Sequence, residues 1–181
     1  MKKQLFAIPD RCTGCNRCAY ICSASHEGVF SPYLSRIQIN NFASRGYSVQ
    51  SICFQCSKAS CLEVCPESAL YKDDGVVLVQ RDKCSGCGEC VSACPYGMIE
   101  IDNTGGVRKC DLCGGAPLCV EECFTKALVY CEPTADLAKL KGAQLRLRSQ
   151  QGSPGEKRFR LGKALMDKAR STEEADTAQK N

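Results

Sequence analysis

The 181-residue sequence has no Trp, a single His, few aromatic residues and no long run of apolar residues. Its apolar segments are shorter than the roughly 20 residues that a membrane-spanning helix needs. Met1, Lys2 and Lys3 open the chain, but Pro9 and Asp10 follow too soon for the apolar core of a signal peptide. We therefore expect a cytoplasmic protein without direct membrane insertion and without a large apolar core.

Patterns typical of catalytic and nucleotide-binding sites are also missing. The sequence has no Gly-rich phosphate loop, no dinucleotide fingerprint and no recognisable pair of nucleophile and base. Glu121 and Glu122 are adjacent, so they cannot share one helical face as a catalytic carboxylate pair. The sequence therefore predicts a protein that is not itself an enzyme.

Cysteine is the residue that the sequence has in abundance, with 17 of 181 positions. Such a share indicates a disulfide scaffold or a metal protein, and a reducing compartment favours the metal protein. The seventeenth cysteine, Cys131, stands apart and is expected to be a small buried thiol. The other sixteen form four groups of four, in chain order Cys12, Cys15, Cys18, Cys22; Cys53, Cys56, Cys61, Cys65; Cys84, Cys87, Cys90, Cys94; and Cys110, Cys113, Cys119, Cys123.

The first and third groups are near copies of each other, 72 residues apart. Residues 10–22 and 82–94 both read Asp, basic residue, Cys, hydroxyl residue, Gly, Cys, two residues, Cys, three residues, Cys. Three such closely spaced thiolates converge on one small object, and a cubane of four irons offers one thiolate site per iron. The spacing favours 4Fe–4S clusters over zinc, which usually takes two ligands from each of two separated pairs.

The fourth cysteine of each group lies four residues beyond the third, which on a helix is one turn along the same face. In the bacterial ferredoxin run Cys-x2-Cys-x2-Cys-x3-Cys-Pro, this cysteine binds the other cluster. Pro66 and Pro95 complete the run in the second and third groups. Ser23 and Phe124 replace that proline in the two outer groups, which depart from the run at this point.

The ordered set of four groups resembles the four-cluster, polyferredoxin-type electron-transfer subunits of anaerobic oxidoreductases, over residues 1 to about 131. The motif His26-Glu27-Gly28, Pro32 and Ser35-Arg36-Ile37 looks most like the ferredoxin subunits of tungsten aldehyde oxidoreductase-type enzymes. The resemblance implies four 4Fe–4S clusters. It also implies their ligand sets, which are Cys53, Cys56, Cys61 with Cys94; Cys84, Cys87, Cys90 with Cys65; Cys12, Cys15, Cys18 with Cys123; and Cys110, Cys113, Cys119 with Cys22.

The expected fold is α+β, small and loop-rich, with two nested bacterial dicluster ferredoxin-like modules over residues 1–133. The inner module covers about 53–100, and the outer one is built from 1–52 and 101–133. Short hairpins and short helices surround the cysteine loops, with strands expected at residues 4–8, 36–39, 76–80 and 98–101.

Residues 134–181 form a basic tail, which we expect to be partly helical or disordered. It has 11 Lys and Arg against 6 Asp and Glu, whereas residues 1–133 have 13 against 14. Helical pieces are expected at 137–147 and 161–170, separated by the breaker Ser153-Pro154-Gly155, with disorder from residue 171. The tail lacks a series of stacking aromatics, so nucleic acid is not an expected partner.

The resemblance implies relay of single electrons to or from a larger catalytic subunit, of the tungsten or molybdenum aldehyde oxidoreductase type. Other electron-transfer subunits or a ferredoxin are further possible partners. The alternatives are a free soluble polyferredoxin, a subunit of carbon monoxide dehydrogenase, hydrogenase or formate dehydrogenase, and a zinc-binding structural module. His26 is either a ligand or a donor to an outer cluster or, as the more ordinary interpretation, a residue without such a role.

Overall fold

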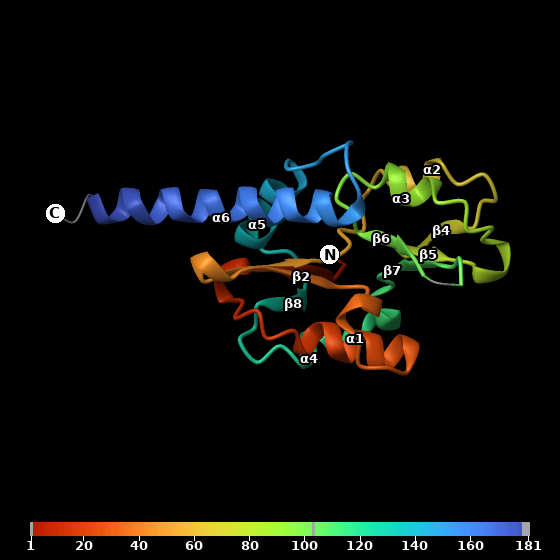
Figure 1. Cartoon of the computed structure of the whole chain (residues 1–181), viewed down its shortest axis with the longest axis horizontal. Coiled ribbons are helices and arrows are strands. Elements are labelled where there is room, and N and C mark those ends of the chain that lie inside the picture. Colours follow the sequence, from red (N-terminus) through yellow and green to blue (C-terminus); the bar gives the residue numbers. More distant parts are fainter. Residues whose placement is uncertain (1, 103, 179–181) are drawn as a thin grey trace.

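The computed structural model describes residues 2–102 and 104–178, with side chains described to Ser171. Figure 1 shows two lobes of short strands and helices, with a long C-terminal helix lying along one side. Among the helices of the described part, none has the length and apolar character to cross a membrane. The strands and short helices confirm the expected small α+β fold.

The eight strands of the described residues form four separate antiparallel pairs. These are β1 (Gln4–Ala7) with β8 (Leu128–Cys131), β2 (Gln38–Phe42) with β3 (Tyr47–Ser51), β4 (Leu70–Asp73) with β5 (Val76–Val79), and β6 (Ile99–Ile101) with β7 (Val107–Lys109). The first pair joins the two ends of the cysteine-bearing part. The second differs from the expected strand at 36–39, because β2 begins at Gln38 and continues into a turn where Gly46 has a φ of 60°.

The helices are short except for the first and the last two. They are α1 (Arg17–Glu27), α2 (Ser60–Glu63), α3 (Glu89–Ala93), α4 (Leu118–Glu121), α5 (Ala135–Leu145) and α6 (Pro154–Ala178). The 72-residue repeat reappears in three dimensions, since a 3₁₀ turn precedes each first cysteine, at Pro9–Arg11 and at Arg81–Lys83. The glycines in the repeat, Gly14 and Gly86, have φ of 71° and 72°, a conformation that glycine adopts without strain.

The hydrophobic core is divided into two clusters, and cysteines belong to both. One cluster joins residues of β1, α1, α4 and β8 and includes Cys18, Cys22 and Cys119. The other joins residues of β3 to β7 with α6 and includes Cys90 and Cys94. Large apolar side chains are few, so the thiols occupy positions that aliphatic residues fill in an ordinary core.

The C-terminal segment differs from the expected tail, because α6 is one helix from Pro154 to Ala178. The helix begins inside the expected breaker for a local reason. The backbone N–H and hydroxyl of Ser153 donate to Glu156 Oε2 at 2.7 and 3.0 Å, and the N–H of Glu156 donates to Ser153 Oγ at 3.4 Å. This reciprocal capping box stabilises a helix start, and Pro154 fits the first helical position.

The first half of α6 packs on the body rather than extending into solvent. Leu161 and Leu165 lie four residues apart on one face and are buried, and Leu161 is only 2% exposed. A side chain at Gly162 would place its Cβ 2.9 Å from Cε2 of Phe42 in β2, so only glycine permits this close approach. The helix is therefore a structural part of the protein.

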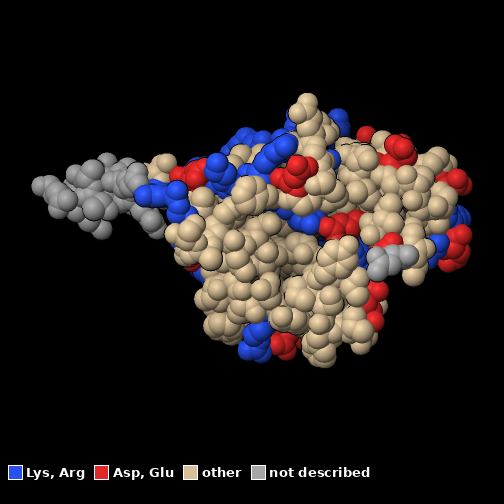
Figure 2. Space-filling view, in the orientation of Figure 1, with Lys and Arg blue, Asp and Glu red and all other residues tan. Residues whose placement is uncertain are grey.

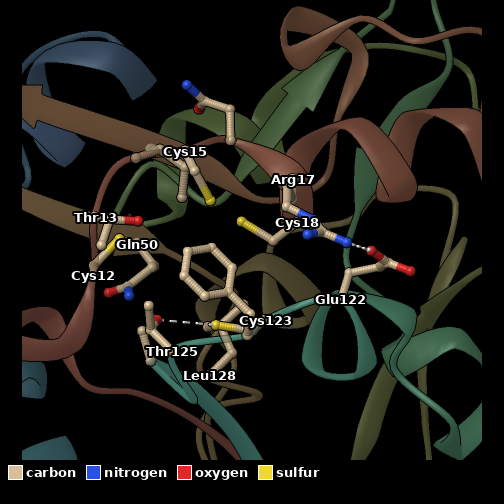
Figure 3. Close-up of a pocket in the computed structure, with 14 residues that line it drawn as sticks. Cys12, Thr13, Cys15, Arg17, Cys18, Gln50, Glu122, Cys123, Thr125 and Leu128 are labelled. Atoms are coloured by element: carbon tan, nitrogen blue, oxygen red, sulfur yellow. Dashed lines mark hydrogen bonds and ion pairs between the residues drawn. The ribbon is translucent and has the colours of Figure 1, made fainter.

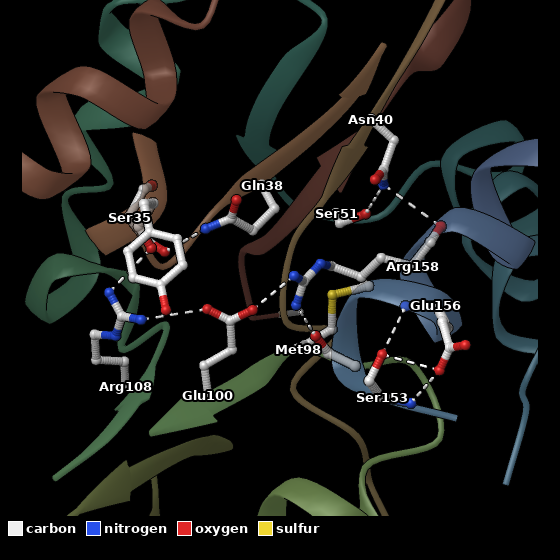
Figure 4. A network of polar contacts seen from close by, with 12 residues as sticks. Ser35, Gln38, Asn40, Ser51, Met98, Glu100, Arg108, Ser153, Glu156 and Arg158 are labelled. Carbon is white, nitrogen blue, oxygen red and sulfur yellow. Dashed lines mark hydrogen bonds and ion pairs between the residues drawn. The ribbon is translucent and has the colours of Figure 1, made fainter. Parts of the chain in front are cut away.

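A polar network fixes the start of α6 to the inner strands, as Figure 4 shows. Arg158 donates through Nη1 to the carbonyl of Gly97 at 2.5 Å and through Nη2 to Glu100 Oε1 at 2.6 Å. Glu100 also pairs with Arg108 at 3.4 Å, and Arg108 donates to the carbonyl of Tyr33 at 3.0 Å. The network thus ties α6, β6, β7 and the loop after α1 together.

Replacement of Leu161 should measure how much this packing contributes. Leu161→Ala removes a buried side chain, and we expect the free energy of unfolding to fall by about 2–5 kcal/mol. The matched control is Lys163→Ala, two residues along the same helix at an exposed position. Thermal or denaturant unfolding of the intact protein measures both. Equal stability of the two variants would contradict the role of α6 in the core.

Candidate metal centres

The structure brings the sixteen grouped cysteines together as four sets, each drawn from two groups. Set 1 contains Cys12, Cys15, Cys18 and Cys123; set 2 contains Cys22, Cys110, Cys113 and Cys119; set 3 contains Cys53, Cys56, Cys61 and Cys94; and set 4 contains Cys65, Cys84, Cys87 and Cys90. All seventeen cysteines are free thiols, so a disulfide scaffold is absent from the described chain.

Set 1 lines a hollow of about 330 Å³ between α1 and the chain that follows α4. Figure 3 shows the four side chains around this hollow. At its rim, Arg17 of α1 forms an exposed ion pair with Glu122 at 2.7 Å and lies 6.0 Å from the ring centre of Phe124. These contacts hold the third cysteine of the first group near the last cysteine of the fourth.

Set 2 lines a second hollow, of about 350 Å³, to which α1 contributes Cys22 and His26 and α4 contributes Cys119. His26 lies at its edge, with Nε2 3.7 Å from Cys113 Sγ and 3.6 Å from Asp111 Oδ1. Arg36 forms an ion pair with the same carboxylate at 2.7 Å, and its backbone N–H donates to Cys22 Sγ at 3.4 Å. Burial, followed by the Arg36 charge, lowers the pKa of His26, so its imidazole is neutral at pH 7.

Sets 3 and 4 are related by the two short helices α2 and α3, which pack against each other. The third and fourth cysteines of one group lie in different sets. In the second group, Cys61 is in set 3 and Cys65 is in set 4. The backbone N–H four residues beyond the fourth cysteine then donates to its sulfur, at 3.3 Å both from Ala69 and from Met98. Strands β4 and β6 start at the next residue, which explains why the sequence repeats the same offset.

Burial shifts the titration of these thiols strongly. It raises the pKa of Cys18 and Cys61 to about 12 and that of Cys90 to about 11. In each case the other cysteines of the same set raise the pKa further, because thiolates gathered in one place repel one another. These three thiols are thus protonated at neutral pH unless a cation compensates their charge. Such sites bind metal with release of protons.

The buried amide of Gln50 indicates whether the set 1 hollow fits an inorganic cluster. The residue belongs to β3, is 4% exposed and lies beside Cys12 and Thr125 in the wall of the hollow, as Figure 3 shows. Neither Oε1 nor Nε2 of its amide has a hydrogen-bond partner within the described chain. A buried amide without partners is costly, and a sulfur-rich anion in the hollow would accept from Nε2. The donor set and this amide both fit an iron–sulfur cluster.

The structure shows where two further residues of the sequence analysis, Cys131 and His26, lie relative to the four sets. Cys131 lies outside the four sets, at the end of β8, and is half-buried. His26, for which a role was the less ordinary interpretation, lies against Cys113 in set 2. Gln50 was not predicted, because nothing in the sequence pattern distinguishes it from other strand residues.

Comparison with known proteins agrees with this donor set. Residues 45–132 match a 4Fe–4S dicluster domain, and residues 9–25 match a 4Fe–4S binding domain. The chain is 44% identical over 88 residues to the polyferredoxin-like subunit of an aliphatic sulfonate oxidoreductase from Pyrococcus furiosus, covering 48% of this chain and 50% of that protein. It is 32% identical over 95 residues to the electron transport protein HydN of Escherichia coli, covering 50% and 54%.

Further matches include a tetrathionate reductase subunit from Archaeoglobus fulgidus, 38% identical over 84 residues, covering 44% of this chain and 39% of that protein. Among solved structures, the active site complex BamBC of benzoyl coenzyme A reductase is similar, with 26% identity, a TM-score of 0.42 and coverage of 80% and 89%. The chain spans about half the length of the curated relatives it matches.

These matches confirm the predicted iron–sulfur chemistry and give no support to the zinc alternative. They cover all four cysteine groups, since the first group lies within 9–25 and the other three within 45–132. Residues 9–25 and 45–132 are thus 4Fe–4S binding regions of the ferredoxin type, and the chain is an iron–sulfur protein related to electron-transfer subunits of oxidoreductases.

Proposed function

We propose that the protein binds four 4Fe–4S clusters, one in each of sets 1 to 4, and relays single electrons to or from a larger catalytic oxidoreductase subunit. The observation that carries this proposal is that the four cysteine sets are arranged as neighbours in one row. When bound, a 4Fe–4S cluster accepts and releases one electron at a time. The contribution of the chain is to hold the sets close together and to keep water away from them.

The row follows from the contacts between sets. Sets 1 and 2 share α1, which contains Cys18 and Cys22, and the charge of Cys18 also acts on Cys119. Sets 2 and 3 adjoin because Cys53 is, after burial, the strongest influence that raises the pKa of Cys110. Sets 3 and 4 adjoin through α2 and α3. The order along the molecule is therefore 1, 2, 3, 4.

The two ends of this row are its most accessible points. Cys15 in set 1 and Cys87 in set 4 are exposed, whereas every other cysteine is half-buried or buried. A relay needs this arrangement, because a partner must approach the first and last sites while the internal ones stay protected from solvent. Electrons then enter at one end and leave at the other.

The set 1 end supports the proposal of a large protein partner. Tyr20 and Phe124, next to this set, expose 40% and 59% of their surfaces, whereas Phe30 and Tyr33, also exposed, follow the other end of α1, which contains His26. Figure 2 shows few charged side chains over the region of α1 and β2, whereas Lys and Arg gather along the C-terminal helices. An uncharged face with exposed aromatics is typical of an interface with another subunit. We assign the catalytic subunit to this face.

The finer parts of the proposal concern the partner and the module boundaries. The names of the relatives support an oxidoreductase partner, and a tungsten or molybdenum aldehyde oxidoreductase-type enzyme remains our proposal. The nested modules, inner from about 53–100 and outer from 1–52 with 101–133, agree with the way each set combines two groups. The main alternative is a free polyferredoxin, which would purify from its source without a larger subunit.

Cluster content is the first prediction. Protein purified without oxygen should contain about 16 iron and about 16 acid-labile sulfide per chain, because each cubane has four of each. Its broad brown absorbance should bleach with dithionite. Chemical analysis against protein concentration provides the count. About 8 iron per chain would contradict four clusters, and zinc without sulfide would contradict the proposed chemistry altogether.

Crossed ligation is the second prediction. Cys94→Ser should alter the cluster held by Cys53, Cys56 and Cys61, because Cys94 lies in set 3 although its own triplet lies in set 4. Cys65→Ser is the matched variant, and it should alter the cluster of the triplet that begins at Cys84. Electron paramagnetic resonance of the reduced proteins distinguishes the two changes. A variant that disturbs only its own triplet's cluster would refute the assignment.

Gln50 provides a third prediction. Gln50→Leu removes a donor worth about 1 kcal/mol, so reduction of the set 1 cluster should become roughly fivefold less favourable while the iron content stays unchanged. Thr13→Val, at an exposed position lining the same hollow, is the control and should have little effect. Redox titration followed by paramagnetic resonance measures both. An unchanged titration in Gln50→Leu would show that this amide does not reach the cluster.

A further inference from the structure

Lys109 is a buried cation without an acidic partner. The side chain, at the end of β7, is 4% exposed, and its Nζ donates to Val77 O at 2.6 Å, to Cys110 O at 3.0 Å and to Gln55 Oε1 at 3.1 Å. All three acceptors are neutral. No carboxylate of the described residues lies within ion-pair distance of this ammonium group. Burying an ammonium group among neutral acceptors alone is costly, and an anion close to it would offset that cost.

Lys157 shows the same combination on a different element. It belongs to α6, is 2% exposed, and its Nζ donates to Ser92 O at 2.8 Å and to Cys94 O at 3.0 Å. Again the acceptors are neutral carbonyls, and no ion pair joins Lys157 to an acidic residue of the described chain. The long α6 helix therefore inserts a second unneutralised ammonium group beside a cysteine of set 3.

Lys141 is the third such group and comes from α5. It is half-buried, donates to Gln4 Oε1 at 2.9 Å and lies 5.4 Å from the ring centre of Phe6. Its charge interacts favourably with Cys53 and Cys56 when these are thiolates. A cation–π contact and a neutral amide orient the ammonium group without neutralising it.

The three lysines converge on one cysteine set. Lys141 acts on Cys53 and Cys56, the charge of Lys109 favours the thiolate of Cys61, and Lys157 binds the carbonyl of Cys94. Every cysteine of set 3 thus has a lysine near it, and these lysines are on three separate elements.

The other sets have no comparable group of free cations among the described residues. Beside set 1, Arg17 is exposed and paired with Glu122, and beside set 2, Arg36 is paired with Asp111. Lys109 also borders set 2 through Cys110. The hollow of set 4 is lined by Glu67 and by neither Lys nor Arg. The positive charge around the row is therefore concentrated at its third site.

We propose that Lys109, Lys141 and Lys157 supply the counter-charge for the cluster of set 3 and make it the site with the highest reduction potential of the four. The proposal rests on the function proposed above, because it requires a cluster in set 3. Reduction adds one negative charge to the site, and buried cations beside it stabilise that charge far more than exposed ones do. An electron in the relay therefore occupies the set 3 cluster in preference to the other three.

Two of these three lysines come from the C-terminal segment. Helices α5 and α6 then border an internal redox site, to which they contribute Lys141 and Lys157. A cluster held by Cys94 and its set would offset the cost of burying the Lys157 ammonium group.

The test measures reduction equilibria one cluster at a time. The intact protein is titrated with redox mediators under paramagnetic resonance, and Cys56→Ser identifies the signal of set 3. That signal should appear at the highest potential in the unaltered protein. Lys109→Met, Lys141→Met and Lys157→Met should each make its reduction about tenfold less favourable, a shift of 59 mV for one electron, and should change set 4 much less.

Lys72→Met is the matched control. Lys72 also donates to carbonyls beside this set, those of Cys56 and Ser57 at 2.8 Å each, but its side chain is exposed. Solvent screens its charge, so we expect less than a threefold change. An effect of Lys72→Met as large as that of the buried lysines would overturn the proposal, since burial would then not matter.

Iron analysis distinguishes a failure of this proposal from a failure of the function on which the proposal rests. Each variant is compared at full iron content. Lys109→Arg keeps the positive charge, so the reduction potential of set 3 should stay near that of the unaltered protein. Should Lys109→Met fail to assemble, the half-buried Lys141→Met gives the decisive measurement. Four clusters with unshifted potentials would overturn the role of the lysines alone. Fewer than four clusters in the unaltered protein would contradict the proposed function.

Discussion

Concentration of negative charge inside a small protein is the constraint on which this structure depends. Sixteen thiols lie in four sets, and burial together with repulsion from the other thiols of the same set raises the pKa of Cys18, Cys61 and Cys90 far above neutrality. Cluster binding requires these thiols to be deprotonated, so the fold must compensate the anionic sites. Backbone N–H groups aimed at Cys22, Cys65 and Cys94 contribute part of that compensation. In our proposal, buried lysines contribute a further part at the third site of the row.

The arrangement of the cysteines was largely predictable because it is local. A left-handed glycine, a 3₁₀ turn and one turn of helix separate the ligands, and each feature follows from a few neighbouring residues such as Gly14 and Gly86. The strand starts at Leu70 and Ile99 also repeat a local offset. The sequence thus predicted the α+β class and four of the eight short strands of the described residues, and the ligand pairing between groups came only from the resemblance.

The surroundings of the sets could not be predicted in the same way, because they depend on contacts between distant residues. Lys157 reaches Cys94 across 63 positions, and Lys141 reaches Gln4 across 137. Gln50 lies beside Cys12 and Thr125 because the register of β3 with β2 decides which side chains point inward. Composition alone suggested that residues 134–181 form a basic, partly helical or disordered tail. Net charge could not reveal Lys157 as buried, because a buried lysine and an exposed one contribute equally to it.

The C-terminal segment shows why net charge is a poor guide to position. Burial of an ammonium group is costly unless an anion compensates it, and the cysteine-bearing part would provide such anions once its clusters are bound. In our proposal, Lys141 and Lys157 of the C-terminal segment are thus part of the electrostatic surroundings of set 3. The capping box at Ser153 and the close contact at Gly162 place α6 where Lys157 meets Cys94, so helix position and the electrostatics of the third site are set together.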